Sequence, residues 1–448
     1  MLESEKKYLF IVLIHAFIGV AMFYVPFFPK IYGYSIIFGG IYFAVKNSNQ
    51  NNEVLYAAAY MVGSEILLRM TDGNPIYEFS KYGVIMLVLI GIYYSGISKN
   101  ALPYWLFLIL LIPGVIEATY STDYYGSLRK MISFNISGPL CLGISALYTY
   151  NRKVTFSQLG EILLAAGLPI ISVMVYLSLY TPNIKDIITG TGSNVEASGG
   201  FGPNQVSTIL GLGMFIFVSR LIFNSRSKVL LLINLIIVFN ISFRGLMTFS
   251  RGGMLTGGMM IVVLILITYV KINNSGRMKM NAMIAFVSIA MVAIWLYSLD
   301  QTGGLIQKRY SNQDAAGRVK ESQFTGREGI FNDQMIDFLG NPVFGVGVGI
   351  NTENRIKRTG LELLSHNEIG RMLAEHGALG VMGLLILALT PLILYLDNKD
   401  NFFIVCFVIF WLLTINHAAM RLAVPAYIYS LSLLKISLNE EKHPVHRE

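Results

Sequence analysis

Residues 252–271, GGMLTGGMMIVVLILITYVK, form an unbroken apolar run that ends at a single lysine. A helix of this length rises about 30 Å, which matches the thickness of the hydrocarbon core of a bilayer. The only charged residue, Lys271, stands at one end, where it can reach the membrane surface. The run therefore predicts a membrane-spanning helix.

Similar apolar runs recur along the whole chain. We expect spans at 8–28, 31–45, 54–70, 82–97, 102–118, 131–150, 159–180, 203–223, 228–243, 252–271, 282–299, 377–396, 402–417 and 421–437. The first run resembles a signal peptide, but it is long and no small-residue cleavage pattern follows it, so we interpret it as retained. Because several runs are short, we predict an all-α polytopic membrane protein with about 12 to 14 transmembrane helices.

The overall composition supports this fold class. Of 448 residues, 54% are hydrophobic and only 13% are charged, with a mean hydropathy of +0.58, which is too apolar for a water-soluble domain. The net charge of +8 is spread singly or in pairs between apolar runs, so we predict no nucleic-acid partner. The two cysteines, Cys141 and Cys406, lie inside apolar runs and indicate neither a disulfide nor a metal site.

The basic residues of the short loops predict which side each loop faces. With the amino terminus inside, three basic loops fall on the cytoplasmic side; they hold Arg152 and Lys153, then Arg220, Arg226 and Lys228, then Lys271, Arg277 and Lys279. The same count puts the segments 181–202, 244–251 and 300–376 on the outer face. We therefore divide the chain into a transmembrane bundle (1–299), an extracytoplasmic loop (300–376), and C-terminal spans with a cytoplasmic tail (377–448).

The loop 300–376 is much longer than a connection requires, and such loops are usually functional or disordered. Its apolar residues at helical spacing predict one helix face made by Phe331, Met335, Ile336, Phe338 and Leu339. Asn341 and Pro342 end that helix, and residues 345–349, with glycine at every second position, predict a tight turn. We therefore expect an ordered loop.

The segment Ser250-Arg251-Gly252-Gly253 lies where a span meets the outer surface. Glycines there let the backbone approach a ligand closely, and a guanidinium suits bidentate contact with phosphate. The structural alternative is an interfacial arginine beside a glycine packing contact between helices. Taken alone, the segment leaves both interpretations open.

His366 is the strongest histidine candidate. It lies in Ser365-His366-Asn367-Glu368, and the small and apolar residues that follow at helical spacing place it near a helix start at the membrane surface. Asn367 and Glu368 can orient its ring. Weaker cases, for which a structural role is the default, are His15, His376, His417, His443 and His446.

Charged residues elsewhere favour structural roles. Glu65 and Arg69 stand four residues apart in one span and can neutralise each other, which weakens the case for a proton relay. The outer segments contain scattered acidic residues without metal-ligand spacing, namely Asp300, Asp314, Glu321, Glu328, Asp333 and Asp337. We therefore predict no metal site and no cofactor.

An ordered set of short motifs carries a family resemblance. They are Phe201-Gly202-Pro203-Asn204-Gln205, Ser250-Arg251-Gly252-Gly253, Thr325-Gly326-Arg327, Asn341-Pro342-Val343-Phe344-Gly345-Val346-Gly347, and His366-Asn367 through Glu375-His376-Gly377. In this order, over the second half of the chain, they resemble the O-antigen ligase and Wzy-type polymerase superfamily of bacterial membrane glycosyltransferases.

The resemblance implies a GT-C-like enzyme of lipopolysaccharide or other polysaccharide biosynthesis. It would act outside the cytoplasmic membrane on a glycan carried by undecaprenyl pyrophosphate, by an inverting and metal-independent reaction. The family pattern matches Arg251 and Arg327 as substrate-binding residues and His366 as the catalytic residue. Further substrate-binding candidates from the same outer segments are Asn204, Arg244 and Asn367. The chain departs from the family in having more predicted spans and in Glu328, where an aromatic residue is common.

Other functions remain open at this stage. A ligase transfers the glycan to the lipid A core or to a protein, and a polymerase transfers it to the non-reducing end of another lipid-linked glycan. The clear His366-Asn367 pair favours the ligase slightly. A flippase for lipid-linked sugars would share the span count, but the sequence has no internal repeat of the kind that transporters show. A membrane scaffold would leave the ordered motifs unexplained.

We predict that residues 300–376 are extracytoplasmic. Single cysteines introduced at Ser311 or Thr359 are expected to react with a membrane-impermeant maleimide in intact cells from which any outer membrane has been removed. Labelling that occurs only after lysis would reverse the assigned topology.

Overall fold

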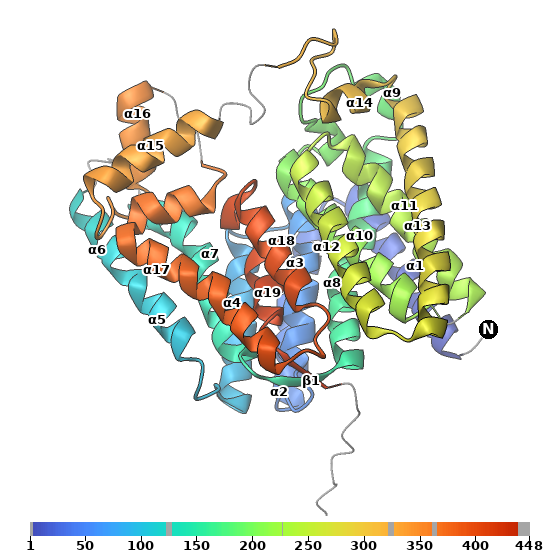
Figure 1. Cartoon of the computed structure of the whole chain (residues 1–448), viewed down its shortest axis with the longest axis horizontal. Helices are drawn as coiled ribbons and strands as arrows, with labels where there is room; N and C mark the ends of the chain where they lie inside the picture. The colour runs from blue at the N-terminus through green and yellow to red at the C-terminus, as the bar shows by residue number, and fades with distance from the viewer. Residues whose placement is uncertain (1–2, 122–127, 226, 321–326, 361–364, 438–448) are drawn as a thin grey trace, which may run out of the picture.

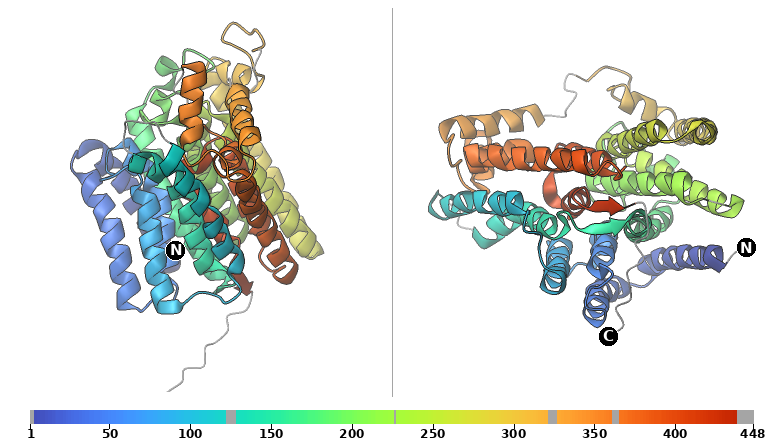
Figure 2. Two further views of the ribbon diagram at one scale, coloured as in Figure 1. Left: turned by 90° about the vertical axis from the view of Figure 1, so that its left-hand side faces the viewer. Right: turned by 60° about the horizontal axis from the view of Figure 1, so that its bottom comes forward.

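A computed structural model of the chain describes residues 3–121, 128–225, 227–320, 327–360 and 365–437 (Figure 1). Nearly all of its regular structure is helical, and the described residues contain only two strands of three residues each. The long helices stand side by side in one bundle (Figure 2). The predicted all-α fold is confirmed.

The helices and strands follow one another along the chain. The first half contains α1 (Glu3–Tyr24), α2 (Phe28–Lys46), α3 (Glu53–Met70), α4 (Phe79–Ser95), α5 (Leu102–Leu110), α6 (Ile112–Ser121), α7 (Leu128–Thr149), β1 (Lys153–Thr155), α8 (Phe156–Tyr180), α9 (Ile184–Ile187), the 3-10 helix η1 (Glu196–Ser198) and α10 (Pro203–Phe223). The second half contains α11 (Lys228–Met247), α12 (Arg251–Lys271), α13 (Asn274–Gln301), α14 (Leu305–Tyr310), α15 (Arg327–Gly340), α16 (Ile350–Thr359), α17 (Glu368–Asp397), α18 (Ile404–Ile415), the 3-10 helix η2 (Ala419–Arg421), α19 (Val424–Leu431) and β2 (Lys435–Ser437).

Nine helical segments of the described chain are long and apolar enough to cross a membrane. They are α1, α5 together with α6, α7, α8, α10, α11, α12, α13 and α17. Two shorter apolar helices, α4 and α18, match further predicted spans. The chain is therefore a multi-pass membrane protein, as the apolar runs predict.

The last predicted span, 421–437, is wrong as a single helix. α19 has only eight residues and rises about 12 Å, far less than the ~30 Å hydrocarbon core. The chain then leaves the helix, because side chains of Asn398 and Asn401 donate to the Leu434 carbonyl (2.8 and 3.3 Å), and β2 pairs in parallel with β1. These partners lie far away in the sequence, so the apolar run alone predicted a continuous helix.

The predicted span 102–118 matches the candidate span Leu102–Ser121, in which the helix is interrupted at Leu111. α5 ends at Leu110 and α6 begins at Ile112, directly before Pro113. Proline lacks the N–H that a continuous helix would donate to the carbonyl four residues earlier, which explains the break at this point.

The three segments predicted to face outward lie together at one end of the bundle. Lys185 forms an ion pair with Asp300 (3.4 Å), the Asn194 N–H donates to the Thr248 carbonyl (2.9 Å), and the Arg244 guanidinium donates to the Thr181 carbonyl (3.0 Å). α14, α15 and α16 lie at this same end (Figure 1). We call it the loop end.

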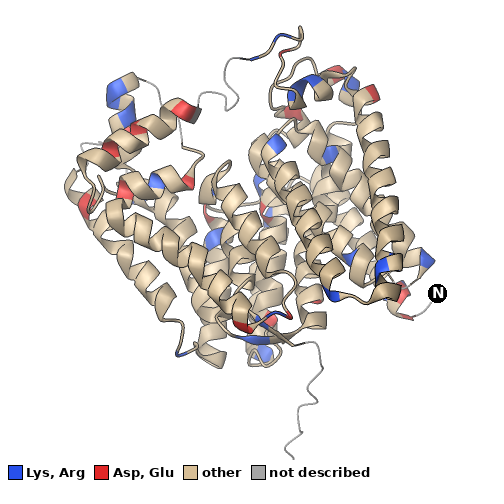
Figure 3. Ribbon diagram, viewed as in Figure 1, with Lys and Arg blue, Asp and Glu red and all other residues tan. Residues whose placement is uncertain are grey.

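The opposite end of the bundle carries the basic short loops and the β1–β2 pair. Charged residues gather at the two ends, and few lie between them (Figure 3). This distribution is expected of helices that cross an apolar layer, because charged side chains are costly inside it.

Two prolines inside long helices each leave one backbone carbonyl without its helical N–H partner, and a buried side chain donates to it instead. Pro139 in α7 cannot donate to the Asn135 carbonyl, which instead accepts from the Arg371 guanidinium (2.9 Å). Pro391 in α17 likewise leaves the Leu387 carbonyl to the Tyr429 hydroxyl (2.8 Å). In both cases a side chain from another helix replaces the lost bond, as backbone groups within a membrane bundle require.

The predicted pairing of Glu65 with Arg69 is confirmed. The guanidinium lies 3.0 Å from the carboxylate, and both side chains are buried. The second carboxylate oxygen accepts from the backbone N–H of Ala423 (2.8 Å), and Arg69 donates to the Arg421 carbonyl (3.3 Å). The pair therefore also fixes the irregular chain that precedes α19.

Replacing Glu65 with alanine should destabilise the protein strongly, by about 3–5 kcal/mol, because it leaves a buried guanidinium and the Ala423 N–H without their partner. Thermal unfolding in detergent measures the effect. The double variant Glu65→Leu with Arg69→Met should lose less stability than Glu65→Ala, because it leaves no buried guanidinium without its partner. Asp300→Asn, which breaks an exposed ion pair, should change the melting temperature little. Equal melting temperatures for Glu65→Ala and Asp300→Asn would contradict the assigned role.

Candidate functional site

α17 begins at Glu368, earlier than the predicted span 377–396. Asn367 is its N-cap, and the Asn367 side-chain oxygen accepts from the backbone N–H groups of Ile369 and Gly370 (2.9 and 3.2 Å). The helical path breaks at Gly377, whose φ of +58° and ψ of −137° are not helical. The predicted position of His366 near a helix start is confirmed, and the last residues assigned to the outer loop belong to this helix.

Several contacts fix the segment that carries His366. The Ser365 hydroxyl accepts from the Gln334 amide of α15 (2.9 Å), and the Ser365 carbonyl accepts from the Arg421 guanidinium (2.7 Å). The His366 carbonyl accepts from the Ala419 N–H (3.1 Å). His366 itself is half-buried, so its position is set by α15 on one side and by the α18–α19 connection on the other.

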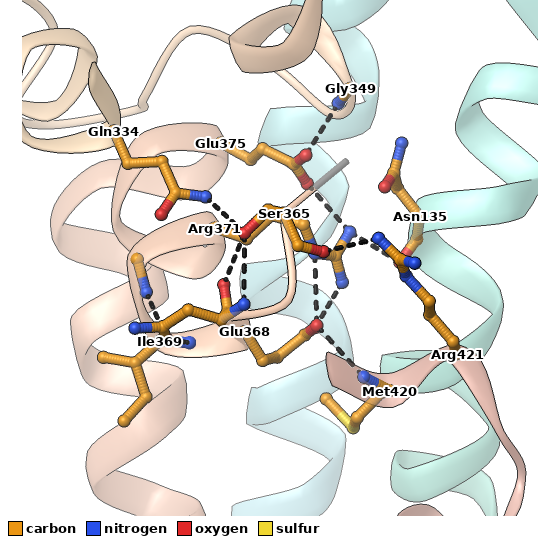
Figure 4. A network of polar contacts seen from close by, with 12 residues as sticks. Asn135, Gln334, Gly349, Ser365, Glu368, Ile369, Arg371, Glu375, Met420 and Arg421 are labelled. Carbon is orange, nitrogen blue, oxygen red and sulfur yellow. Dashed lines mark hydrogen bonds and ion pairs between the residues drawn. The ribbon is translucent and has the colours of Figure 1, made fainter. Parts of the chain in front are cut away.

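A buried ionic network of Glu368, Arg371 and Glu375 lies in the first two turns of α17, directly after the segment that carries His366 (Figure 4). The Arg371 guanidinium contacts Glu368 on one side and Glu375 on the other (3.2 Å). Glu368 also accepts from the Met420 N–H (3.3 Å), and Glu375 accepts from the Gly349 N–H (3.0 Å). Glu368, expected to orient the His366 ring, is therefore engaged by Arg371 and by the backbone.

The glycine-rich turn 345–349 packs against the break in α17. The Val346 N–H donates to the Ala374 carbonyl (2.9 Å) and the Val348 N–H to the Gly114 carbonyl of α6 (2.9 Å). A Cβ at Gly345 would lie 2.4 Å from the Glu375 backbone, and this glycine has a φ of +75°. The predicted tight turn is confirmed, and it joins α15 and α16 to the bundle.

α15 forms where the apolar spacing predicts a helix, but the face it packs inward is polar. Gln334 and Asp337 are buried, whereas Ile336 and Leu339 are exposed; of the apolar set, Phe331 packs beside Gly370 of α17. Asp337 binds the Arg358 guanidinium of α16 (2.7 Å), and Gln334 binds Ser365. α15 turns Gln334 and Asp337 inward because both find hydrogen-bonding partners there. The spacing of apolar residues alone does not reveal which face of the helix is buried.

The segment Ser250–Gly253 opens α12 at the loop end. Arg251 is the first residue of the helix and is partly exposed. The Ser250 hydroxyl donates to the side-chain oxygen of Asn204 (2.8 Å) and accepts from Ser207 (3.0 Å). Asn204 is therefore part of the scaffold that holds the start of α12 against α10.

The two glycines of this segment are packing residues. A Cβ at Gly253 would lie 2.2 Å from the Ser207 backbone of α10, and a Cβ at Gly252 would lie 2.6 Å from the His417 ring. His417 in turn binds the Thr208 hydroxyl (3.1 Å) and the Leu413 carbonyl (2.8 Å). Of the two interpretations of the motif, helix packing holds for the glycines, while the partly exposed Arg251 keeps its candidate role.

Arg309 in α14 holds the turn before Arg251. It is buried and donates to the Phe249 carbonyl (2.8 Å) and to the Ser193 hydroxyl (3.2 Å). Phe249 has a φ of +55°, a conformation that costs free energy in a residue with a side chain. Arg309 thus ties α14 to the turn and to the loop 181–202.

Positive charge accumulates beside Arg251. Burial, together with the charges of Arg309 and Arg251, lowers the pKa of Lys320. Burial raises the pKa of Tyr310 to about 12, although Arg251 and Arg309 act in the opposite direction. The bond from Arg309 to the Phe249 carbonyl, two residues before Arg251, agrees with these effects and places basic groups around Arg251, which suits an anionic ligand.

Two other predicted residues have different outcomes. Arg244 is buried and its guanidinium binds the Thr181 carbonyl and hydroxyl (3.0 and 3.2 Å), so it ties a loop to α11. Arg327 is the first residue of α15, and its side chain, like Thr325 and Gly326, lies outside the described residues.

The α18–α19 connection, residues 416–423, brings the predicted motifs together. His417 contacts Gly252 and Thr208, whereas Ala419 and Arg421 contact the backbone of His366 and Ser365. His417 and Ala419 are two positions apart, so their Cα atoms are at most about 7.6 Å apart. Sequence reasoning missed Arg421 and Arg309, and it gave His417 only a default structural role, because their partners are distant in the chain and no local pattern marks them.

Comparisons and a search for metal-binding groups add no further assignment. No protein-family model matches the chain, and a search of curated proteins finds no significant match. Within the ranges that the structure describes, no three His, Cys, Asp or Glu side chains are grouped so that they could hold a metal ion.

Gly253→Ala should lower the stability by about 1–3 kcal/mol, because the added methyl group has no room beside the α10 backbone. Gly258→Ala on the same helix is the matched control. No atom lies within 4 Å of its added Cβ, so it should leave stability unchanged or raise it by about 0.5–1 kcal/mol. Unchanged thermal unfolding of Gly253→Ala would argue against the packing role and for close approach of a ligand.

Proposed function

We propose that the protein is a membrane glycosyltransferase of the O-antigen ligase type. It transfers a glycan from undecaprenyl pyrophosphate to an acceptor hydroxyl at the outer face of a bacterial cytoplasmic membrane, without a metal ion and with inversion at the anomeric carbon. The loop end is its extracytoplasmic face.

One observation carries this proposal. The starts of α10, α12 and α17, which hold three of the ordered motifs, meet on the α18–α19 connection at the loop end. Arg251, with Arg309 and Lys320 near it, forms a basic region there, and His366 is attached to the same connection. A base and a basic region are what transfer from a lipid pyrophosphate requires.

In the proposed reaction one proton is transferred, and the bond from the anomeric carbon to the pyrophosphate is replaced by a bond to the acceptor oxygen. Neutral His366 accepts the proton of the acceptor hydroxyl, and the oxygen attacks the anomeric carbon as the bond to the pyrophosphate breaks. The electron pair of that bond leaves with undecaprenyl pyrophosphate, whose negative charge Arg251 and Arg327 balance. Glu368 is a weaker base candidate because Arg371 and the Met420 N–H already engage its carboxylate.

Two alternatives use the same features differently. A Wzy-type polymerase would use the same site with a lipid-linked glycan as acceptor. A lipid-linked sugar flippase is favoured by the break in α17 at Gly377, since interrupted helices are frequent in transporters. Removing the gene separates ligase from polymerase: long lipid-linked chains should accumulate when a ligase is lost, and single repeat units when a polymerase is lost.

His366→Ala should lower transfer by about 10²- to 10⁴-fold, the usual loss when a general base is removed. Transfer is measured in proteoliposomes with a lipid-linked donor, and donor binding should persist. His376→Ala is the control: His376 is buried and packs against Gly114, so its loss should lower the melting temperature while each folded molecule keeps its activity. More than about a tenth of wild-type transfer by His366→Ala would move the catalytic role to another residue.

Transfer should survive EDTA, because arginines take the charge-balancing role that a divalent cation has in other enzymes with pyrophosphate donors. The assay is the same proteoliposome reaction before and after chelation. Activity that disappears on chelation and returns with Mg²⁺ or Mn²⁺ would reveal a metal requirement.

A further inference from the structure

The second half of α15 exposes apolar side chains on its outward face, whereas Glu328 and Asn332, which are also exposed, lie in the first half of the helix. Its exposed fractions reach 56% for Ile336 and 71% for Leu339, and the chain that follows the helix exposes 55% of Val343 and of Phe344. We call these four residues the α15 patch; Phe331, which is less exposed, packs beside Gly370 of α17. Apolar residues on an unpaired helix face indicate contact with a membrane or a partner.

Contacts of the opposite face hold α15 in this orientation. Gln334 binds Ser365, and Asp337 binds both Arg358 and Asn354 of α16 (2.7 and 3.2 Å). If α15 turned its apolar residues inward, these buried polar groups would lose their hydrogen-bond partners. Each unpaired group would lower the stability of the fold. The exposure of the α15 patch is therefore built into the packing.

The patch continues the lipid-facing surface of the bundle. Directly after Phe344, the backbone of Gly347 lies against Ala118 of α6, and the Val348 N–H donates to the Gly114 carbonyl. α6 belongs to a candidate membrane span and exposes Ile112 and Ile116 by about half. Figure 1 shows α15 lying across the end of the bundle beside α6 and α17, at a large angle to long helices such as α13.

We propose that α15 is an interfacial helix whose apolar patch inserts into the bilayer at the boundary between headgroups and acyl chains. Its occupant is lipid, because the patch adjoins a lipid-facing helix and because an amphipathic helix that lies across the spans matches the geometry of membrane-surface helices. Gln334 of α15 donates to Ser365, next to His366. Insertion of the α15 patch into the bilayer would therefore fix the height of the His366 segment relative to the membrane surface. The proposal rests on the bilayer setting and does not depend on glycosyl transfer.

Spin labels on single cysteines test the proposal in the full-length protein, reconstituted in nanodiscs of phosphatidylcholine and phosphatidylglycerol. Labels replace Leu339 and Phe344 in the patch, with Ile336 as a further position if one variant fails to fold. Lys357, exposed on α16, is the matched control. The native Cys141 and Cys406 are buried and can be replaced by alanine. The readout compares collisions with oxygen, which dissolves in lipid, and with a water-soluble nickel complex.

Patch positions should give oxygen-to-nickel collision ratios several-fold higher than Lys357. A ratio equal to that of Lys357 would mean that the patch faces water and would overturn the proposal. Low collision rates with both reagents would also overturn it, because protein, either a partner or a second copy of the chain, would then cover the patch. The result is independent of transfer activity, so failure here is distinct from failure of the proposed function.

Discussion

Backbone groups inside a membrane bundle must find partners within the protein, and the irregular chain between α18 and α19 satisfies this requirement with buried carboxylates. Glu368 accepts from the Met420 N–H and Glu65 from the Ala423 N–H, and each carboxylate is held by an arginine of its own helix. A third bond joins the Ala419 N–H to the His366 carbonyl. The connection would otherwise leave unpaired polar groups at a cost of several kcal/mol each.

Because this connection lies between distant parts of the chain, it determines which segments become neighbours. α3 contributes Glu65, α17 contributes Glu368, and α10 reaches the connection through Thr208 and His417. Pro139 adds a further link, since the carbonyl it leaves unpaired binds Arg371, which itself holds Glu368. The ordered motifs meet here because their charged and polar groups complete one hydrogen-bonded network.

The segment 300–367 is joined to the bundle at several points. Arg309 ties α14 to the turn before Arg251, Gln334 ties α15 to Ser365, and Gly349 ties the glycine-rich turn to Glu375. If α15 also lies in the membrane interface, the bilayer itself helps to position the segment that carries His366. A site built in this way combines groups from the spans with groups from the loop, which agrees with a substrate that has a lipid part and a polar part.

The sequence by itself determined the membrane setting, because apolar runs of spanning length need no tertiary information. It also determined the Glu65–Arg69 pair, the helix start near His366 and the turn 345–349, since each depends on residues a few positions apart. Only the tertiary structure decided that Gly253 is a packing residue, that Asn204 and Arg244 hold the scaffold, and that α15 turns its polar face inward. The same holds for the short α19 and for His417, Arg421 and Arg309, because their partners come from segments up to hundreds of residues away, and local periodicity carries no information about such partners.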